Sequence, residues 1–126
     1  MDPPKRTQSA GIIERSDGAV LICRRLDSPH WQFPRGDLLG PESPEAAVRR
    51  AAREGVGLDV SVAVGQPPVV EQRGAESVMV RYFICHIRSG EATPRGYDEV
   101  RWILPGQLCE YDFDASTQKV VEWYIA

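Results

Sequence analysis

The stretch that decides the fold is GDLLGPESPEAAVRRAAREGVGL, which spans residues 36–58. Within it, Ser43 is a good N-cap residue, and the proline and glutamate that follow suit the first turn of a helix. Small apolar residues and arginines continue until Gly55 and Gly57 interrupt the pattern. The composition therefore predicts a loop followed by one helix over Pro44–Glu54.

Short apolar runs on both sides of this segment indicate β-strands. Ser9–Glu14 and Ala19–Leu26 are separated by Asp17-Gly18, a dipeptide that favours a tight antiparallel hairpin. Three further strands and a closing amphipathic helix are predicted at Leu58–Val64, Ser77–Ile87, Asp98–Leu104 and Asp114–Ile125. This order indicates a mixed α/β chain without the strict alternation of a doubly wound sheet.

Composition and charge limit both the organisation and the partners. With 126 residues, 42% of them hydrophobic and 26% charged, the chain suits one compact domain. We expect that domain to span residues 9–126, after a loose N-terminal arm at residues 1–8. A net charge of −3 argues against holding long nucleic acid by phosphate neutralisation. No stretch approaches the roughly 20 apolar residues that span a bilayer, so no membrane partner is expected.

The cysteines point to a reducing compartment. Cys23, Cys85 and Cys109 form no CxxC pair, their number is odd, and the start of the chain lacks the apolar core of an export signal. We therefore expect a cytoplasmic protein with reduced thiols. Cys23 and Cys85 lie in apolar runs, which favours a role as small core residues. His30 and His86 are scattered, so no zinc site is predicted.

The spacing within residues 36–58 resembles the Nudix box, whose pattern is G-x5-E-x7-R-E-U-x-E-E-x-G-U, with U aliphatic. The positions in register are Gly36, Glu42, Arg50, Glu54, Gly57 and Leu58. The likeness to MutT-like Nudix hydrolases covers nearly the whole chain. The segment Trp31-Gln-Phe-Pro-Arg-Gly36 is most similar to the branch of dinucleoside polyphosphate hydrolases and RNA pyrophosphohydrolases. The resemblance implies a Nudix-type α/β/α sandwich with a mixed sheet.

The resemblance also implies a divalent metal, Mg²⁺ or Mn²⁺, held by three glutamates of the box helix. Those glutamates correspond to positions 51, 54 and 55, whose i, i+3 and i+4 spacing places them on one helical face. This chain has Ala51, Glu54 and Gly55, so two of the three carboxylates are missing. Glu54 is then the one helix ligand and catalytic candidate, and any metal should be weakly held because Mg²⁺ needs several oxygen ligands.

A further acid of the family often precedes the last strand, and its place here corresponds to Gly96. Asp98 or Glu99 is close enough in sequence to substitute, so Glu99 is a second candidate metal ligand. The alternative is that these acids form a charge pair with Arg101 at the strand edge.

The other residues of the box have structural or binding roles by the same resemblance. Glu42 and Arg50 should brace the loop against the helix, while Gly36, Gly57 and Leu58 serve turns and packing. With few acids left nearby, Arg35, Gly36, Arg50 and Arg53 are candidates for binding a phosphate group without metal. The alternative for Arg49 and Arg53 is a solvated helix face.

Three functions are compatible with these residues. The first is a Nudix domain that binds a nucleoside diphosphate derivative, with weak or lost metal-dependent pyrophosphohydrolase activity. The second is an active Nudix hydrolase that cleaves nucleoside di- or triphosphates or dinucleoside polyphosphates with a reduced metal site. The third is a scaffold or homodimer partner. Trp31, Phe33 and Tyr82 either stack on a nucleotide base or fill the core.

Overall fold

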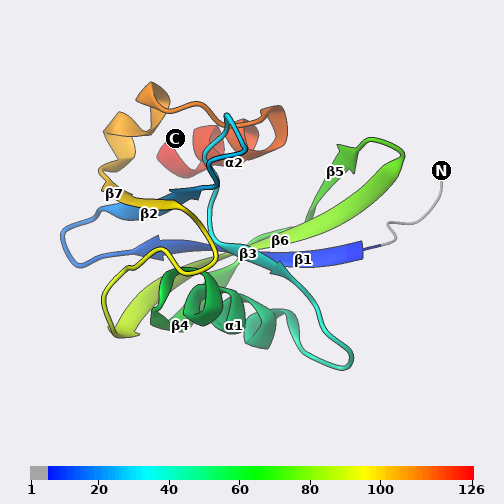
Figure 1. The fold of residues 1–126 in the computed structure, drawn as a ribbon, viewed down its shortest axis with the longest axis horizontal. Coiled ribbons are helices and arrows are strands. Elements are labelled where there is room, and N and C mark those ends of the chain that lie inside the picture. The colour runs from blue at the N-terminus through cyan, green and yellow to red at the C-terminus, as the bar shows by residue number, and fades with distance from the viewer. Residues whose placement is uncertain (1–5) are drawn as a thin grey trace.

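Residues 6–126 are described by a computed structural model, and they form a seven-stranded sheet flanked by helices (Figure 1). The strands are β1 (Arg6–Glu14), β2 (Val20–Arg24), β3 (Arg35–Asp37), β4 (Asp59–Gly65), β5 (Val69–Arg73), β6 (Glu76–Ser89) and β7 (Glu99–Ile103). The helices are α1 (Pro44–Val56), the 3-10 helix η1 (Pro105–Glu110) and α2 (Ala115–Ile125). The main path through the sheet is β4-β6-β1-β2-β7, with β3 beside β1 and β5 beside β6. Because β1 and β6 run parallel and the other pairs antiparallel, the sheet is mixed, as predicted.

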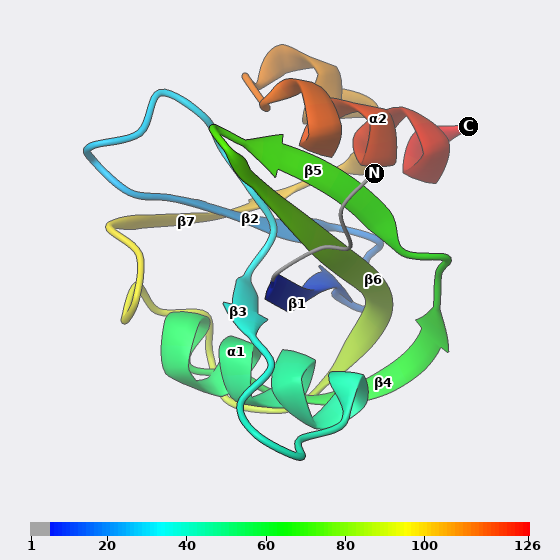
Figure 2. The ribbon, with the colours of Figure 1, turned by 90° about the vertical axis from the view of Figure 1, so that its right-hand side faces the viewer.

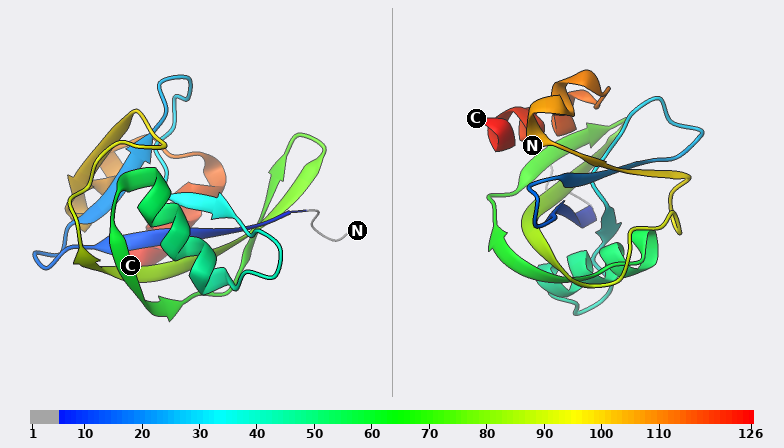
Figure 3. Two further views of the ribbon diagram at one scale, coloured as in Figure 1. Left: turned by 60° about the horizontal axis from the view of Figure 1, so that its bottom comes forward. Right: turned by 90° about the vertical axis from the view of Figure 1, so that its left-hand side faces the viewer.

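The two long helices lie on opposite faces of the sheet, so the α/β/α sandwich is confirmed (Figures 2 and 3). Apolar residues of α1 pack into one buried cluster, which contains Val48, Ala52 and Val56. Val120 and Val121 of α2 join a second cluster, on the other face of the sheet. Each helix therefore covers its own core, which is how an amphipathic helix and a sheet remove their apolar faces from water.

The aromatic residues proposed for base stacking fill the second cluster. Trp31, Phe33 and Tyr82 are at most 6% exposed. Phe33 stacks on Phe113 with ring centroids 6.2 Å apart and meets Tyr82 edge-on at 6.3 Å. These residues are core residues, which is the commoner role of aromatics at strand spacing.

Helix α1 begins as predicted and ends two residues later. The Ser43 side chain accepts a hydrogen bond from the Ala46 backbone N–H at 3.1 Å, which is N-cap geometry. The helix continues through Gly55 to Val56, and the residue that ends it is Gly57, whose φ of 73° lies in the left-handed region. Gly55 is buried and helical, so only the second glycine of the pair is a C-cap.

Other boundaries differ where the strands depend on distant partners. Strand β1 begins at Arg6, so residues 6–8 of the expected loose arm are strand, and residues 1–5 of that arm lie outside the described residues. Parallel pairing with β6 extends this strand, with Arg6 opposite Val78. The short strands β3 and β5 were not predicted. They pair with β1 and β6, respectively, and neither carries a clear alternating pattern of its own.

Two further expectations concern membrane-spanning segments and the cysteine thiols. No helix within residues 6–126 is long and apolar enough to cross a membrane. Cys23 and Cys85 are buried, as expected for core residues, whereas Cys109 is exposed. Within the same residues all three cysteines are free.

Candidate functional site

The loop before α1 is tied to the helix by the Glu42–Arg50 pair. Arg50 Nε donates to Glu42 Oε2 at 3.0 Å and Arg50 Nη2 to Glu42 Oε1 at 3.1 Å, a two-pronged contact. Arg50 also donates to the Asp37 carbonyl, and Glu42 accepts from the Leu39 backbone N–H at 3.1 Å. The Arg50 hydrogen bonds are the main cause that lowers the pKa of Glu42 below its usual value. The pair thus has the bracing geometry expected of the box.

A cavity of about 160 Å³ lies against the same helix and brings most of the candidate residues together. Its lining includes Arg35, Gly36, Arg50 and Glu54, all predicted from the sequence. The remaining lining residues are Arg25, Ala51, Gly55, Gly96 and Tyr97. Two candidates lie elsewhere. Arg53 is an exposed residue of α1 outside the lining, and the Glu99 side chain pairs with Arg24.

The Tyr97 ring fills the space beside position 55. A Cβ atom added to Gly55 would lie 2.9 Å from Tyr97 Cε2, a distance that real Cβ atoms essentially never show. The loop carrying Tyr97 is held against the helix end, because the backbone N–H groups of Arg95 and Gly96 donate to the Gly55 carbonyl at 3.1 and 2.9 Å. A Cβ added to Gly96 would in turn lie 3.2 Å from the Gly55 Cα. Positions 55 and 96, which the resemblance assigns to two family acids, are therefore packed against each other with little space for a side chain.

The Tyr97 hydroxyl completes this packing with polar contacts. It accepts from Gln32 Nε2 and from the Arg35 backbone N–H, both at 3.1 Å, and donates to the Arg35 carbonyl at 3.4 Å. Burial raises the pKa of Tyr97 to about 12, so the phenol is neutral at physiological pH. A buried hydroxyl with three partners costs little to keep in place, which makes the ring a stable part of the wall.

The carboxylates present do not fit a divalent metal ion. The Glu54 side chain is 59% exposed, and its Oε1 lies 3.4 Å from Arg50 Nη1. Asp98 accepts from the Leu26 backbone N–H at 2.7 Å, and Glu99 pairs with Arg24 instead of Arg101. Across residues 6–126, no three His, Cys, Asp or Glu side chains are grouped as a metal site. Since Mg²⁺ and Mn²⁺ need several oxygen ligands, Glu54 alone does not make a site for either.

A second cavity, of about 190 Å³, shares Arg25, Arg35 and Tyr97 with the first. Arg6 and Arg73 also line it, so it is rich in guanidinium groups. Gln8 and Gln32 complete the lining and give it further polar surface. The two cavities together form what we call the arginine site, defined by Arg6, Arg25, Arg35, Arg50 and Arg73.

Arg35 is neutralised by a carboxylate that sequence reasoning missed. Its Nη2 lies 2.8 Å from Glu71 Oε2, and the two side chains are only 7% and 2% exposed. Arg73 approaches the same oxygen at 3.1 Å. The expectation that Arg35 faces few acids is therefore wrong. Glu71 lies on the unpredicted strand β5, where a glutamate among the valines of Val-Val-Glu was the available signal.

Arg25 differs from the other arginines of the site. Its guanidinium carbon lies 5.3 Å from the centre of the Tyr97 ring, a cation–π contact. Among residues 6–126 it makes no ion pair, and it lines both cavities. The arginine site therefore contains one exposed cation whose charge is not offset, beside a neutral aromatic wall.

Comparison with known proteins identifies the family. A family model described as the NUDIX domain matches residues 4–124. The chain belongs to the Nudix family. This Nudix chain is 32% identical to a MutT-like protein of Streptomyces ambofaciens over 110 residues, which are 86% of the chain and 70% of that relative. It is 36% identical to an RNA pyrophosphohydrolase of Gluconacetobacter diazotrophicus over 76 residues, 53% of the chain and 46% of that relative.

Solved structures of the family share the fold. The MutT protein of Methanosarcina mazei superposes with a TM-score of 0.84 at 17% identity, covering 98% of this chain and 95% of that one. A Caenorhabditis elegans Ap4A hydrolase gives a TM-score of 0.80 at 13% identity and 94% coverage of both chains. Nudix hydrolases generally use divalent metal ions and act on small nucleotide substrates. The packing of Tyr97 against Gly55 therefore distinguishes this site from one that holds a divalent metal ion by a carboxylate at position 55.

Proposed function

We propose that this Nudix chain binds a nucleoside diphosphate derivative at the arginine site and has weak or no metal-dependent pyrophosphohydrolase activity. The observation that carries the proposal is the Tyr97 ring against Gly55. It fills the space in which a carboxylate from position 55 would reach a metal. Ala51 removes a second ligand of the same face.

The binding half of the proposal rests on charge and shape. Arg25 supplies an exposed guanidinium with no carboxylate partner in the described residues, and a guanidinium donates two parallel hydrogen bonds to a phosphate. The two cavities meet at Arg25, Arg35 and Tyr97, so a diphosphate can contact both. The relatives named for MutT, RNA pyrophosphohydrolase and Ap4A hydrolase activities support a nucleotide as the class of ligand.

The weakness of turnover follows from the missing ligands. In a diphosphate hydrolase, metal ions neutralise the phosphate oxygens and activate the attacking water. Guanidinium groups can neutralise phosphate charge, but a protonated guanidinium is no base for water. Glu54 is the one acidic residue in the lining of the cavity beside α1, and Arg50 already neutralises part of its charge.

One observation favours the second function, an active hydrolase. Glu54 is exposed at the cavity, where its carboxylate and the oxygens of a bound diphosphate together could hold a metal ion that the protein alone does not. Activity of this kind would depend on high metal concentration, because each ion arrives with its substrate.

The binding test is calorimetric titration of the protein with GDP in the presence of EDTA. We expect measurable binding without metal. Arg25→Gln should weaken it by about tenfold or more, the loss expected for a charge-assisted contact. Arg53→Gln is the matched control, since Arg53 is an exposed arginine outside both cavities, and its affinity should equal that of the parent. GDP binding that requires Mg²⁺, or an affinity that Arg25→Gln leaves unchanged, contradicts the proposal.

The turnover test measures release of nucleoside monophosphate or diphosphate. Candidate substrates are GTP, diadenosine tetraphosphate and RNA with a 5′-triphosphate, each with Mg²⁺ or Mn²⁺. We expect little or no product from any of them. Rapid metal-dependent product release that disappears in Glu54→Gln would establish the active hydrolase instead.

A further inference from the structure

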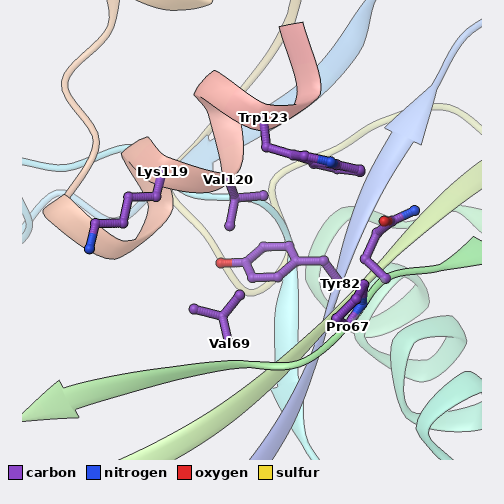
Figure 4. Close-up of a pocket in the computed structure, with 7 residues that line it drawn as sticks. Pro67, Val69, Tyr82, Lys119, Val120 and Trp123 are labelled. Carbon is purple, nitrogen blue, oxygen red and sulfur yellow. The ribbon is translucent and has the colours of Figure 1, made fainter. Parts of the chain in front are cut away.

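A third cavity, of about 310 Å³, lies beneath α2 and is separate from the arginine site. It is bounded by Gln66, Pro67, Val69, Tyr82, Lys119, Val120 and Trp123, and Figure 4 labels the last six. None of its lining residues also lines the cavities of the arginine site. Its volume is at the lower end of the range for small-molecule sites. We call it the α2 pocket.

An incompletely satisfied pair of buried hydroxyls, from Tyr82 and Thr117, lies beside this pocket. Tyr82 is only 2% exposed, and its ring points between Val69 and Val120, with the hydroxyl on the side of Lys119 (Figure 4). The Tyr82 hydroxyl interacts with the Thr117 hydroxyl, which is buried and has no other hydrogen-bond partner within residues 6–126. Since an unpaired buried donor is costly, such groups usually mark a place that a bound molecule or water satisfies.

The protonation of Tyr82 makes it a donor. Burial is the largest cause that raises the pKa of Tyr82 to about 12, so the phenol keeps its proton at physiological pH. The nearest carboxylates, Glu71 and Asp114, do not oppose an anion strongly. Glu71 is paired with Arg35 and Arg73, and Asp114 lies 3.8 Å from Arg73.

The rest of the pocket combines flat apolar walls with one cation. The Trp123 side chain is 47% exposed, although large aromatic residues are usually more buried. Pro67, Val69 and Val120 supply further apolar surface. Lys119 is exposed at the edge and makes no ion pair in the described part of the chain. A flat ring suits the walls, and an anionic acceptor suits the two donors.

We propose that the α2 pocket binds a planar aromatic carboxylate. Its ring packs between Trp123 and the apolar floor at Val69, and its carboxylate accepts from the Tyr82 hydroxyl near the Lys119 ammonium. This inference does not depend on the nucleotide proposal, because the two sites share no residue.

The test is calorimetric titration with 2-naphthoate, compared with 2-naphthalenemethanol, which has the same rings and no charge. We expect the carboxylate to bind at least about tenfold more tightly than the alcohol. Tyr82→Phe and Lys119→Gln should each weaken naphthoate binding by roughly tenfold, and Trp123→Ala should weaken binding of both probes. Glu122→Gln, an exposed change on the same helix outside the pocket, is the control and should have no effect.

Four results would overturn the inference. The first is equal binding of the alcohol and the carboxylate, and the second is naphthoate binding that Trp123→Ala leaves unchanged. The third is displacement of naphthoate by GDP, which would place the probe in the arginine site. Should one variant fail to fold by circular dichroism, the other two single variants still decide the question. The fourth is absence of naphthoate binding. If Trp123→Ala then also changes the mass in sedimentation, the pocket is an interface between copies.

Discussion

The two ends of the site along α1 face the same cavity with different chemistry. At one end, Arg50 holds Glu42 and the Asp37 carbonyl and ties the loop to the helix. At the other end, Gly55 has no side chain and the Tyr97 ring lies where one would extend. The comparison teaches that the contact holding the box in shape can be present while positions 51 and 55 of the same helix carry no carboxylate. The brace needs only a pair of residues on one helix and its loop, whereas the metal centre needs space.

The largest expected effect tests whether the buried Arg35–Glu71 pair contributes more to stability than the Glu42–Arg50 pair. Glu71→Gln leaves the Arg35 guanidinium, 7% exposed, without its compensating charge. We expect the free energy of unfolding to fall by about 3 kcal/mol, as for other buried pairs that lose one partner. Urea denaturation of Glu71→Gln beside Glu42→Gln makes the measurement. A larger loss of stability for Glu42→Gln would show that the Glu42–Arg50 pair contributes more to stability than the Arg35–Glu71 pair.

The second prediction concerns a variant that places carboxylates at positions 51 and 55 and removes the Tyr97 ring. Ala51→Glu and Gly55→Glu alone do not make room for a metal, so we add Tyr97→Ala to remove the ring. The triple variant should gain Mn²⁺ binding by calorimetry and turn over GTP at least about a hundredfold faster than the parent, the contribution of a positioned base. Ala51→Glu with Gly55→Glu, in the presence of Tyr97, is the control that should show no gain. An active double variant would mean that Tyr97 does not block the site.

The third prediction concerns the clash itself. Gly55→Glu should lower the free energy of unfolding by about 2 kcal/mol, because the new Cβ and carboxylate meet the Tyr97 ring in a closed space. In a Tyr97→Ala background, Gly55→Glu should lower the free energy of unfolding much less. A double-mutant cycle by urea denaturation measures this difference directly. Additive effects of the two changes would show that residues 55 and 97 do not interact.

The smallest effect tests the brace by pH. The Arg50 hydrogen bonds lower the pKa of Glu42 in the folded state, so the carboxylate stabilises the fold above its unfolded pKa near 4.5. This contribution is lost as the pH falls through the lower folded value. The midpoint temperature of the parent should therefore drop more between pH 6 and pH 3 than that of Glu42→Gln. Parallel melting curves would contradict a structural role for the ionised pair.

Local signals in the sequence were sufficient for much of the fold. Ser43 and Gly57 set the ends of α1 within two residues, because capping depends on the residues next to the helix. Asp17-Gly18 likewise marked the turn between β1 and β2. Strand β3 could not be placed, because it forms by pairing with the distant strand β1, with Arg35 opposite Ala10. Strand β5 pairs with the next strand, β6, across a tight turn at Gly74, but its short segment carries no clear alternation of apolar and polar residues.

The candidate site likewise had features that the sequence predicted and features that only the folded structure shows. The spacing of Glu42 and Arg50 predicted a contact that the structure contains, and Ala51 and Gly55 showed which ligands are absent. The sequence did not indicate what occupies the space instead. Tyr97 reaches Gly55 from a loop more than 40 residues downstream, and its hydroxyl is fixed by Gln32 and Arg35 from the opposite direction. Only the folded arrangement brings these residues together.

The contact between Gly55 and Tyr97 also restricts the mutational routes by which position 55 could acquire a carboxylate. A carboxylate introduced at position 55 first meets the ring, so that step carries a loss of stability before any gain in metal binding. The change of Tyr97 to a small residue, taken first, opens a cavity and removes three hydrogen bonds. Either order passes through a less stable protein, so the contact between Gly55 and Tyr97 makes a carboxylate at position 55 difficult to reach by single substitutions.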